Sequence, residues 1–235
     1  MIRQLPLALA LRHAPDLRDF VAGPNQAILD ALRRGLDGER EPLIYLFGAS
    51  GSGRSHLLLG QCAAAQLRGL RCAYLPLAAR EELATAMLDG LETLDLVAVD
   101  DVHAIAGDRP WEEALFALFN RCRDRGTRML FSADRGPAAL PLTLADLRSR
   151  LAWGLTIGLQ PLDDAARHAL LLALAARRAL QVPDEVARYL LERGPRHPGG
   201  LVELLTRLDH DSLAAQRRLT IPFVRDRLQV GQSVD

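Results

Sequence analysis

Residues 48–55 read Gly48-Ala49-Ser50-Gly51-Ser52-Gly53-Arg54-Ser55 and form a glycine-rich segment. The segment follows an apolar run, residues 43–47, that is typical of a buried strand, and it precedes a helix-like run that starts at His56. A strand, a glycine-rich loop and a helix in this order are the setting of a phosphate-binding loop. Glycines let the backbone turn so that its N–H groups converge on phosphate oxygens, and the helix N-terminus adds partial positive charge. The segment therefore predicts a nucleotide site.

Two side chains decide the chemistry of this loop. Ser55 stands where a hydroxyl would ligate Mg²⁺, whereas Arg54 stands where such loops usually carry lysine. A planar guanidinium does not replace a compact ammonium at the β- and γ-phosphates. The chain has no lysine, so all 29 of its basic residues are arginine and Arg54 also fits a general drift in composition. We expect this segment to bind ADP or ATP with Mg²⁺, and intrinsic hydrolysis to be weak or absent. The residues expected to contact the nucleotide are Gly48, Ser50, Gly51, Ser52, Gly53, Arg54, Ser55 and His56.

A second apolar run, residues 96–99, ends in two carboxylates, Asp100 and Asp101. In ATPases with a phosphate-binding loop, such a strand forms the second half of the site. There, Asp100 would hold Mg²⁺ through water and Asp101 would orient the attacking water. Acids also end strands because they are solvated there, and for this strand alone that alternative is equally good. The glycine-rich loop upstream favours the functional interpretation.

Asp134 follows the next apolar strand, residues 128–133. Polar groups at the carboxyl edge of an open α/β sheet lie where ligands bind, so Asp134 is a candidate for sensing the γ-phosphate or its water. The sequence Asp134-Arg135-Gly136-Pro137 also predicts a turn. Both interpretations can hold together.

Arg148 and Arg150 lie on a helix predicted over residues 143–151, for which Thr143 is the expected N-cap. An arginine pair usually marks a solvated basic face. In oligomeric ATPases, however, this position supplies an arginine finger to the nucleotide of a neighbour. We expect Arg150 to be that finger, with Arg148 as the second choice.

The order of elements predicts an α/β fold followed by a small all-α domain. Nearly continuous apolar strands that alternate with helices imply a parallel sheet covered by helices on both faces. The expected strands are 43–47, 72–77, 94–101, 128–133 and 155–159. The expected helices include 26–36 before the first strand and 79–90, 111–125 and 143–151 between later strands. From residue 163 the periodicity is helical, over 163–180, 184–193, 199–216 with a break, and 221–228 capped by Thr220. The expected domains are a tail of residues 1–22, a nucleotide-binding domain of 23–160 and an all-α domain of 161–235.

Composition limits the class of protein. The formal net charge is +0, which argues against a large electrostatic footprint for nucleic acid or anionic lipid. No apolar run approaches the roughly 20 residues that a membrane-spanning helix needs. The cysteines Cys62, Cys72 and Cys122 have no metal-ligand spacing and suggest a reducing compartment. We expect a cytoplasmic protein with little direct DNA binding and no membrane partner.

The order of these motifs resembles the AAA+ domain of the DnaA replication-initiator family, over about residues 16–228. The segment Phe20-Val21-Ala22-Gly23-Pro24-Asn25 is similar to the one that leads into the domain and packs on adenine in that family. The resemblance therefore implies that Pro24 and Asn25 contact the nucleotide. It also implies that the C-terminal helices form a lid. The family usually carries a nucleotide-reporting arginine near the last lid helices, where this chain has Gly199, with Arg196 nearby.

Within that family, the chain resembles the Hda group of regulatory inactivators. This resemblance is based on Arg54 in the loop and on residues 220–224 near the C-terminus. We also expect no basic helix-turn-helix domain of the kind that an initiator uses to read origin DNA. The N-terminal stretch is similar to the peptide by which that group binds the replication sliding clamp, a short extended anchor in which a glutamine bonds at a pocket rim and leucines fill apolar pockets. The implied clamp-binding residues are Gln4, Leu5, Leu7 and Leu9. The alternative is that this stretch packs on its own domain.

The resemblance implies a negative regulator of replication initiation that holds ADP and stimulates hydrolysis of DnaA-bound ATP through Arg150 in trans. Its implied partners are DnaA and the DNA polymerase sliding clamp, and it could also form a homo-oligomer. Its implied location is the nucleoid or the replisome. Two alternatives stay open at this point. One is an AAA+ ATPase such as a helicase loader that turns over its own ATP. The other is a degenerate ATPase that serves as an interaction module.

Overall fold

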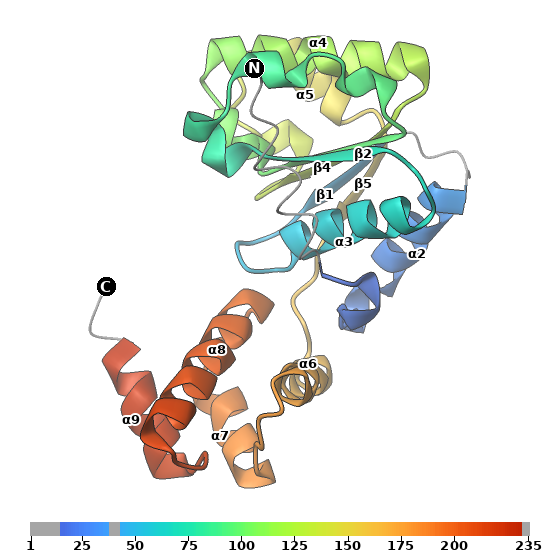
Figure 1. The fold of residues 1–235 in the computed structure, drawn as a ribbon. Helices are drawn as coiled ribbons and strands as arrows, with labels where there is room; N and C mark the ends of the chain where they lie inside the picture. Colours follow the sequence, from blue (N-terminus) through green and yellow to red (C-terminus); the bar gives the residue numbers. More distant parts are fainter. Residues whose placement is uncertain (1–14, 38–42, 232–235) are drawn as a thin grey trace. The chain divides into compact units, whose positions relative to one another are not determined.

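The computed structural model describes residues 15–37 and 43–231, and its centre is a sheet of five parallel strands (Figure 1). The strands are β1 (Leu43–Phe47), β2 (Cys72–Pro76), β3 (Leu96–Asp100), β4 (Arg128–Ala133) and β5 (Leu155–Gly158). Their order across the sheet is β2-β3-β4-β1-β5. Each strand begins and ends within two residues of its prediction, because short apolar runs bounded by turn residues mark buried strands clearly.

Helices cover both faces of the sheet. Figure 1 shows α2 (Gln26–Asp37) and α3 (Arg54–Leu67) on one face, and α4 (Arg109–Arg125) and α5 (Ala145–Leu151) on the other. The strands β1 to β4 are largely buried, whereas the edge strand β5 is half-buried or exposed. The stacked rings of Phe119 and Phe131 join α4 to β4 with centroids 6.3 Å apart. The predicted α/β class with a parallel sheet between two helical layers is therefore confirmed.

The helix predicted over residues 79–90 is replaced by two short 3₁₀ turns, η3 (Leu77–Glu82) and η4 (Thr85–Leu88). Leu77 and Leu88 are fully buried, but the residues between them are half-buried or exposed. An amphipathic helix needs apolar anchors three or four residues apart. The segment has one anchor at each end, so it follows the surface in turns.

The second compact unit consists of residues 21–24 and the chain from Pro161 onward. It contains α6 (Asp164–Arg177), α7 (Asp184–Arg193), α8 (Pro198–Ala215) and α9 (Ile221–Gly231). Its buried core is mostly leucine and includes Leu170, Leu171, Leu174, Val186, Leu190, Leu201, Leu205, Leu208 and Val224. The predicted all-α unit is confirmed, but the break predicted in 199–216 is wrong. Gly199 and Gly200 lie in the first turn of α8 behind Pro198, where they do not interrupt a helix. Among the described residues, no helix is both long and apolar enough to cross a bilayer.

The start of α5 differs from its prediction. Thr143 is not the N-cap: Leu144 occupies that position and makes no side-chain cap. Instead, the Thr143 hydroxyl donates to Glu112 of α4 at 2.8 Å, and the backbone N–H groups of Thr143 and Leu144 donate to the same carboxylate at 3.1 and 2.7 Å. The Gly107 N–H donates to it at 2.8 Å. The start of α5 is therefore fixed by a side chain of another helix, which no local sequence pattern can reveal.

The fully buried Glu112 makes stability depend on pH. Burial acts to raise the pKa of Glu112, but hydrogen bonds from Leu144, Thr143 and Gly107 outweigh it and hold the pKa below the ordinary value of 4.5. The ionised carboxylate therefore stabilises the fold fully above pH 4.5, and this contribution is lost as the pH falls through the lower folded pKa. We expect Glu112→Gln to lower the free energy of unfolding at pH 7 by about 1–3 kcal/mol.

Urea unfolding at pH 7, 5 and 4 checks this expectation. The difference between the wild type and Glu112→Gln should shrink at the lowest pH. The matched control is Glu113→Gln, because Glu113 is the next residue of α4, is exposed and pairs with Arg109 on the surface. A difference that stays constant over this pH range would contradict the role of the ionised Glu112.

Gly154 marks a close approach of two backbones, just before β5. A Cβ at this position would collide with the Leu43 carbonyl oxygen and lie 2.6 Å from the Leu43 Cβ, at the start of β1. Because β1 is fully buried there, Gly154→Ala should destabilise the protein by about 1–3 kcal/mol. Gly35→Ala is the control, since its Cβ would meet only the Ile44 Cδ1 at 3.8 Å within a helix and should be neutral or stabilising. Thermal unfolding of both variants tests this, and equal stability would contradict it.

Candidate nucleotide site

The glycine-rich loop joins β1 to α3 at the carboxyl edge of the sheet. Gly51 and Gly53 have φ of +72° and +104°, values that L side chains rarely adopt, which is why glycine stands at both positions. The Gly48 N–H donates to the Ala133 carbonyl of β4 at 3.3 Å and ties the loop to the neighbouring strand. Because β1 lies between β4 and β5, the loop opens where the strand order reverses, the usual ligand position in such sheets.

The loop fits a chain of phosphates. The Ser52 hydroxyl is buried and has no hydrogen-bond partner among the described residues, so a polar group is prepared there for a ligand. The 14-residue helix α3 begins at Arg54 and directs its first N–H groups toward the loop. No group of three or more histidine, cysteine or acidic side chains in the described ranges could hold a metal alone. A Mg²⁺ ion would therefore depend on Ser55, Asp100 and the oxygens of the nucleotide.

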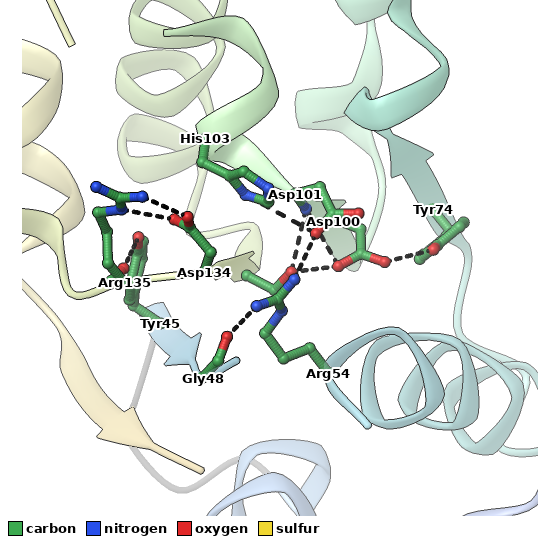
Figure 2. A network of polar contacts seen from close by, with 10 residues as sticks. Tyr45, Gly48, Arg54, Tyr74, Asp100, Asp101, His103, Asp134 and Arg135 are labelled. Carbon is green, nitrogen blue, oxygen red and sulfur yellow. Dashed lines mark hydrogen bonds and ion pairs between the residues drawn. The ribbon is translucent and has the colours of Figure 1, made fainter. Parts of the chain in front are cut away.

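Arg54 reaches across the loop rather than into solvent (Figure 2). It is only 8% exposed, and its Nη1 donates to the Gly48 carbonyl. Its Nη2 donates to Asp101 Oδ1 at 2.9 Å and forms an ion pair with it. The positive charge at the lysine position of the loop is thus already compensated by the acid expected to orient the attacking water.

Asp100 is fixed in place by three donors. It is 1% exposed at the end of β3. The Tyr74 hydroxyl of β2 donates to its Oδ2 at 2.6 Å, the Ser132 hydroxyl of β4 donates to its Oδ1, and the Asp101 N–H donates to Oδ1 at 3.1 Å. Burial and the Asp100 charge raise the pKa of Tyr74, so Tyr74 stays a neutral donor. The carboxylate of Asp100 is therefore held rigidly between the two strands that flank β3.

Tyr74 and Ser132 are site residues that the sequence interpretation missed. Both lie inside apolar strands, where a polar tip is the only signal of a function. β2 and β4 are the two neighbours of β3 in the sheet, so their polar side chains reach the acid that ends β3. That neighbourhood follows from the strand order and not from the strand sequences.

Asp101 has an unusual backbone. Its φ of 54° is in the left-handed region, which is uncommon for a residue other than glycine, although aspartate tolerates it better than most. This conformation turns the side chain toward Arg54, and Oδ1 also lies 3.8 Å from His103 Nδ1. The Asp101 N–H donates to Ser132 Oγ at 3.1 Å. A strained residue held by several partners is typical of functional sites.

Asp134 belongs to the same cluster of charges (Figure 2). Arg135 pairs with it, with Nη2 to Oδ2 at 2.7 Å and Nε to Oδ1 at 3.0 Å. The hydrogen bond from Arg135 lowers the pKa of Asp134, with smaller contributions from the charges of His103 and Arg54. The Tyr45 hydroxyl donates to the Arg135 carbonyl at 2.9 Å and fixes this turn beside β1. The structure thus brings Asp100, Asp101 and Asp134 to one edge of the sheet, beside the loop.

The segment before α2 contributes in two different ways. The Phe20 ring packs on the loop: it lies 5.6 Å from the His56 ring, and a Cβ at Gly53 would be 3.0 Å from it. Asn25 is buried, and its amide donates to the Gln160 carbonyl at 3.0 Å and accepts from the Gln160 N–H at 2.7 Å. Asn25 therefore ties the entry of the first unit to its exit, and its expected nucleotide contact stays a prediction. Pro24 is exposed and groups with the second unit.

Arg150 is not part of this cluster. It lies in the last turn of α5, which leads the chain to Leu155 at the amino end of β5, level with Ile44 of β1. The loop lies at the opposite, carboxyl edge of β1. The Arg150 guanidinium makes no hydrogen bond or ion pair within residues 15–37 and 43–231, whereas the Arg148 guanidinium donates to the Leu142 carbonyl at 3.4 Å. Arg150 is therefore the uncommitted cation of this helix.

The remaining predicted residues have separate places. Gln4, Leu5, Leu7 and Leu9, the expected clamp-binding residues, lie outside the described residues. In the second unit, Arg196 is exposed and Gly199 lies in the first turn of α8. His197 caps that helix, because its Nδ1 accepts from the Gly200 N–H at 3.0 Å.

Comparison with known families explains this architecture. The chain matches the bacterial DnaA ATPase domain over residues 17–158 and the lid domain of Hda over residues 164–228. Domain III of the Thermotoga maritima replication initiation protein DnaA has a similar structure, with a TM-score of 0.81 and 22% identity over 93% of this chain and 95% of that chain.

Two further solved structures show the same fold at greater distance. AMPPCP-bound DnaA from Aquifex aeolicus gives a TM-score of 0.72 and 22% identity over 84% of this chain and 66% of that chain. The Thermotoga maritima RuvB Holliday junction branch migration motor gives 0.70 and 17% over 94% and 73%. The AAA+ fold implied by the motif order is confirmed.

Proposed function

This chain belongs to the bacterial DnaA ATPase family, and on that basis we propose that it is a negative regulator of replication initiation that stimulates the hydrolysis of ATP bound to DnaA. The match of residues 164–228 to the lid domain of Hda supports a regulator of that type. One observation carries the proposal: the chain's own catalytic acid is engaged, whereas its finger candidate is free. Asp101 is paired with Arg54, and Arg150 has no partner among the described residues.

The place of Arg150 supports action on a partner's nucleotide. Arg150 lies in the last turn of α5, which leads to the amino end of β5, while the chain's own loop lies beyond the carboxyl end of β1. In P-loop enzymes, an arginine supplied in trans stabilises the charge that develops on the γ-phosphate in the transition state, with an effect of about 10³–10⁵ on the rate. Arg150 would enter the site of ATP-loaded DnaA and act there as the second half of an active site.

The chain's own site would hold ADP with Mg²⁺. The loop backbone, Ser52 and Ser55 would bind the α- and β-phosphates, and Asp100 would hold the ion through water. Nothing in that set needs a γ-phosphate. A γ-phosphate would have to compete with Asp101 for Arg54, so we propose that ADP binds more tightly than ATP and that intrinsic hydrolysis is weak.

The sliding clamp would localise this activity. The stretch with Gln4, Leu5, Leu7 and Leu9 offers one polar group and three leucines in the pattern of a clamp-binding peptide. Tethering to a clamp loaded on DNA would raise the effective concentration of the regulator near newly replicated DNA in the cytoplasm. DnaA would then be converted to its ADP form where replication has just passed.

The test is phosphate release from ATP-loaded DnaA with sub-stoichiometric amounts of this protein, with and without DNA-loaded clamp. We expect acceleration that depends on the clamp and disappears when residues 1–9 are deleted. Acceleration that is equal without clamp would remove the tethering step. No acceleration, together with turnover of ATP by this protein alone, would favour an independent ATPase. Neither acceleration nor turnover would favour an interaction module.

A further inference from the structure

Glu112 joins two parts of the first unit that carry different chemistry. It is 0% exposed, and four hydrogen bonds satisfy its carboxylate. Oε1 accepts from the Gly107 and Thr143 N–H groups, while Oε2 accepts from the Thr143 hydroxyl and the Leu144 N–H. A buried charge is tolerated only where donors of this number and quality surround it.

The four donors come from two separate segments. Gly107 ends the stretch that leaves the acid strand: Asp101 is followed by η6 (Val102–Ile105) and then by Gly107. Thr143 and Leu144 come directly before α5, the helix of Arg150. A single side chain on α4 thus binds both the segment that follows Asp101 and the residues that begin α5.

The helix α5 depends on this contact for its position. It has seven residues, less than two and a half turns, and its N-cap Leu144 provides no side-chain bond of its own. A local serine or threonine cap would bind N–H groups of the helix's own first turn and would move with the helix. A cap from α4 instead fixes α5 to another element. Leu147 and Leu151 bury the inner face of α5, and Arg150 lies half-buried at the side of that face.

We infer that Glu112 is a positioning residue: it holds α5 against α4 so that Arg150 is presented to a partner in one fixed geometry. The inference rests on the proposed function, because it explains how the position of Arg150, the proposed finger, is fixed. The same carboxylate couples the segment after Asp101 to α5 through Gly107. A shift of the segment after Asp101 would therefore be transmitted through Glu112 to the start of α5.

The test uses Glu112→Gln, which alters the donor pattern selectively. The amide nitrogen of the introduced glutamine can face the Thr143 hydroxyl but not the Leu144 N–H, since two donors would then oppose each other. The carbonyl oxygen of the same amide would keep the bonds from the Gly107 and Thr143 N–H groups. The variant should therefore release α5 while it leaves the segment after the acid strand in place. Glu113→Gln is the matched control, as an exposed change on the same helix.

Two measurements on the full chain with ADP decide the inference. Hydrogen–deuterium exchange over residues 143–151 should become faster in Glu112→Gln and stay unchanged in Glu113→Gln. In single-turnover hydrolysis by ATP-loaded DnaA, the maximal rate at saturating regulator should fall roughly 10–100-fold, because a displacement of about 1 Å has such effects on catalysis. The half-saturating concentration should stay within about twofold. A merely destabilising change would raise that concentration and leave the maximal rate unchanged.

A maximal rate equal to that of Glu113→Gln, or unchanged exchange over residues 143–151, would overturn the inference. If Glu112→Gln does not fold, Thr143→Val replaces it: it removes only the hydroxyl donor and should shift both measurements in the same direction by less. If the wild type gives no stimulation at all, the proposed function fails. In that case the hydrogen–deuterium exchange measurement still tests whether Glu112 stabilises the position of α5.

Discussion

Replacing Arg150 with alanine should abolish the stimulation of ATP hydrolysis on DnaA, with a loss of roughly 10³-fold or more in the maximal rate, as for other fingers supplied in trans. The reason is electrostatic: the guanidinium neutralises charge that develops on the γ-phosphate in a site from which water is excluded. The Arg150 side chain has no hydrogen bond or ion pair within the described residues, so its removal should leave the folding of the chain unchanged. Single-turnover phosphate release from ATP-loaded DnaA with clamp on DNA measures the effect.

Arg148→Ala is the matched control for this experiment. It removes the same charge two residues earlier on α5, but Arg148 is bound to the Leu142 carbonyl on its own surface. We expect this variant to keep most of the stimulation. A result in which Arg150→Ala binds the partner and still stimulates normally would contradict the assignment of the finger. Loss of activity in Arg148→Ala alone would move the finger to that residue.

Replacing Asp101 with asparagine should change the nucleotide preference of the chain. In the wild type, the Arg54 guanidinium is shared between the Gly48 carbonyl and the Asp101 carboxylate, so a γ-phosphate meets a compensated cation beside a negative charge. The asparagine variant removes that charge and leaves at most a weaker, neutral hydrogen bond to Arg54. A hydrogen bond to a charged group contributes about 1.5–3 kcal/mol, so the affinity for ATP relative to ADP should rise about tenfold or more.

Calorimetric titration with ADP and with AMPPCP in place of ATP measures this ratio. Asp95→Asn is the control, since Asp95 lies just before β3, at the end of that strand away from the loop, and pairs with Arg71. That variant should leave the ratio near the wild-type value. Wild-type protein that binds ATP as tightly as ADP, or an unchanged ratio in Asp101→Asn, would contradict the competition for Arg54.

Much of the fold follows from local patterns in the sequence. The run of residues 43–47 before the loop, and the acids that follow the run of 96–99, predict a parallel sheet with a site at its carboxyl edge, and the structure has both. This works because burial on both faces demands uninterrupted apolar strands, and because the positive φ of Gly51 and Gly53 admits little besides glycine. Such constraints act within a few residues of each other, so they can be read along the chain.

The contacts that determine the chemistry of the site could not be predicted in this way. Arg54 and Asp101 were both candidate residues, but only the packing of α3 against β3 makes them a pair. Tyr74 and Ser132 gained a role because β2 and β4 flank the strand of Asp100. These partners are 26 to 47 residues apart, and a pattern that reports local periodicity carries no information on such distances.

Thr143 also shows that local sequence patterns do not determine tertiary contacts. Its sequence context predicts a helix cap, which is the best local use of a threonine before a helix. In the structure the Thr143 hydroxyl instead donates to the buried carboxylate of Glu112 on α4, because a charged acceptor in a dry site forms a stronger hydrogen bond than a neutral one. The sequence thus determined which elements form and where the phosphate loop lies. The tertiary structure determined which charges at the site neutralise one another and that the Arg150 guanidinium on α5 has no partner among the described residues, since those outcomes depend on residues that meet only when the chain has folded.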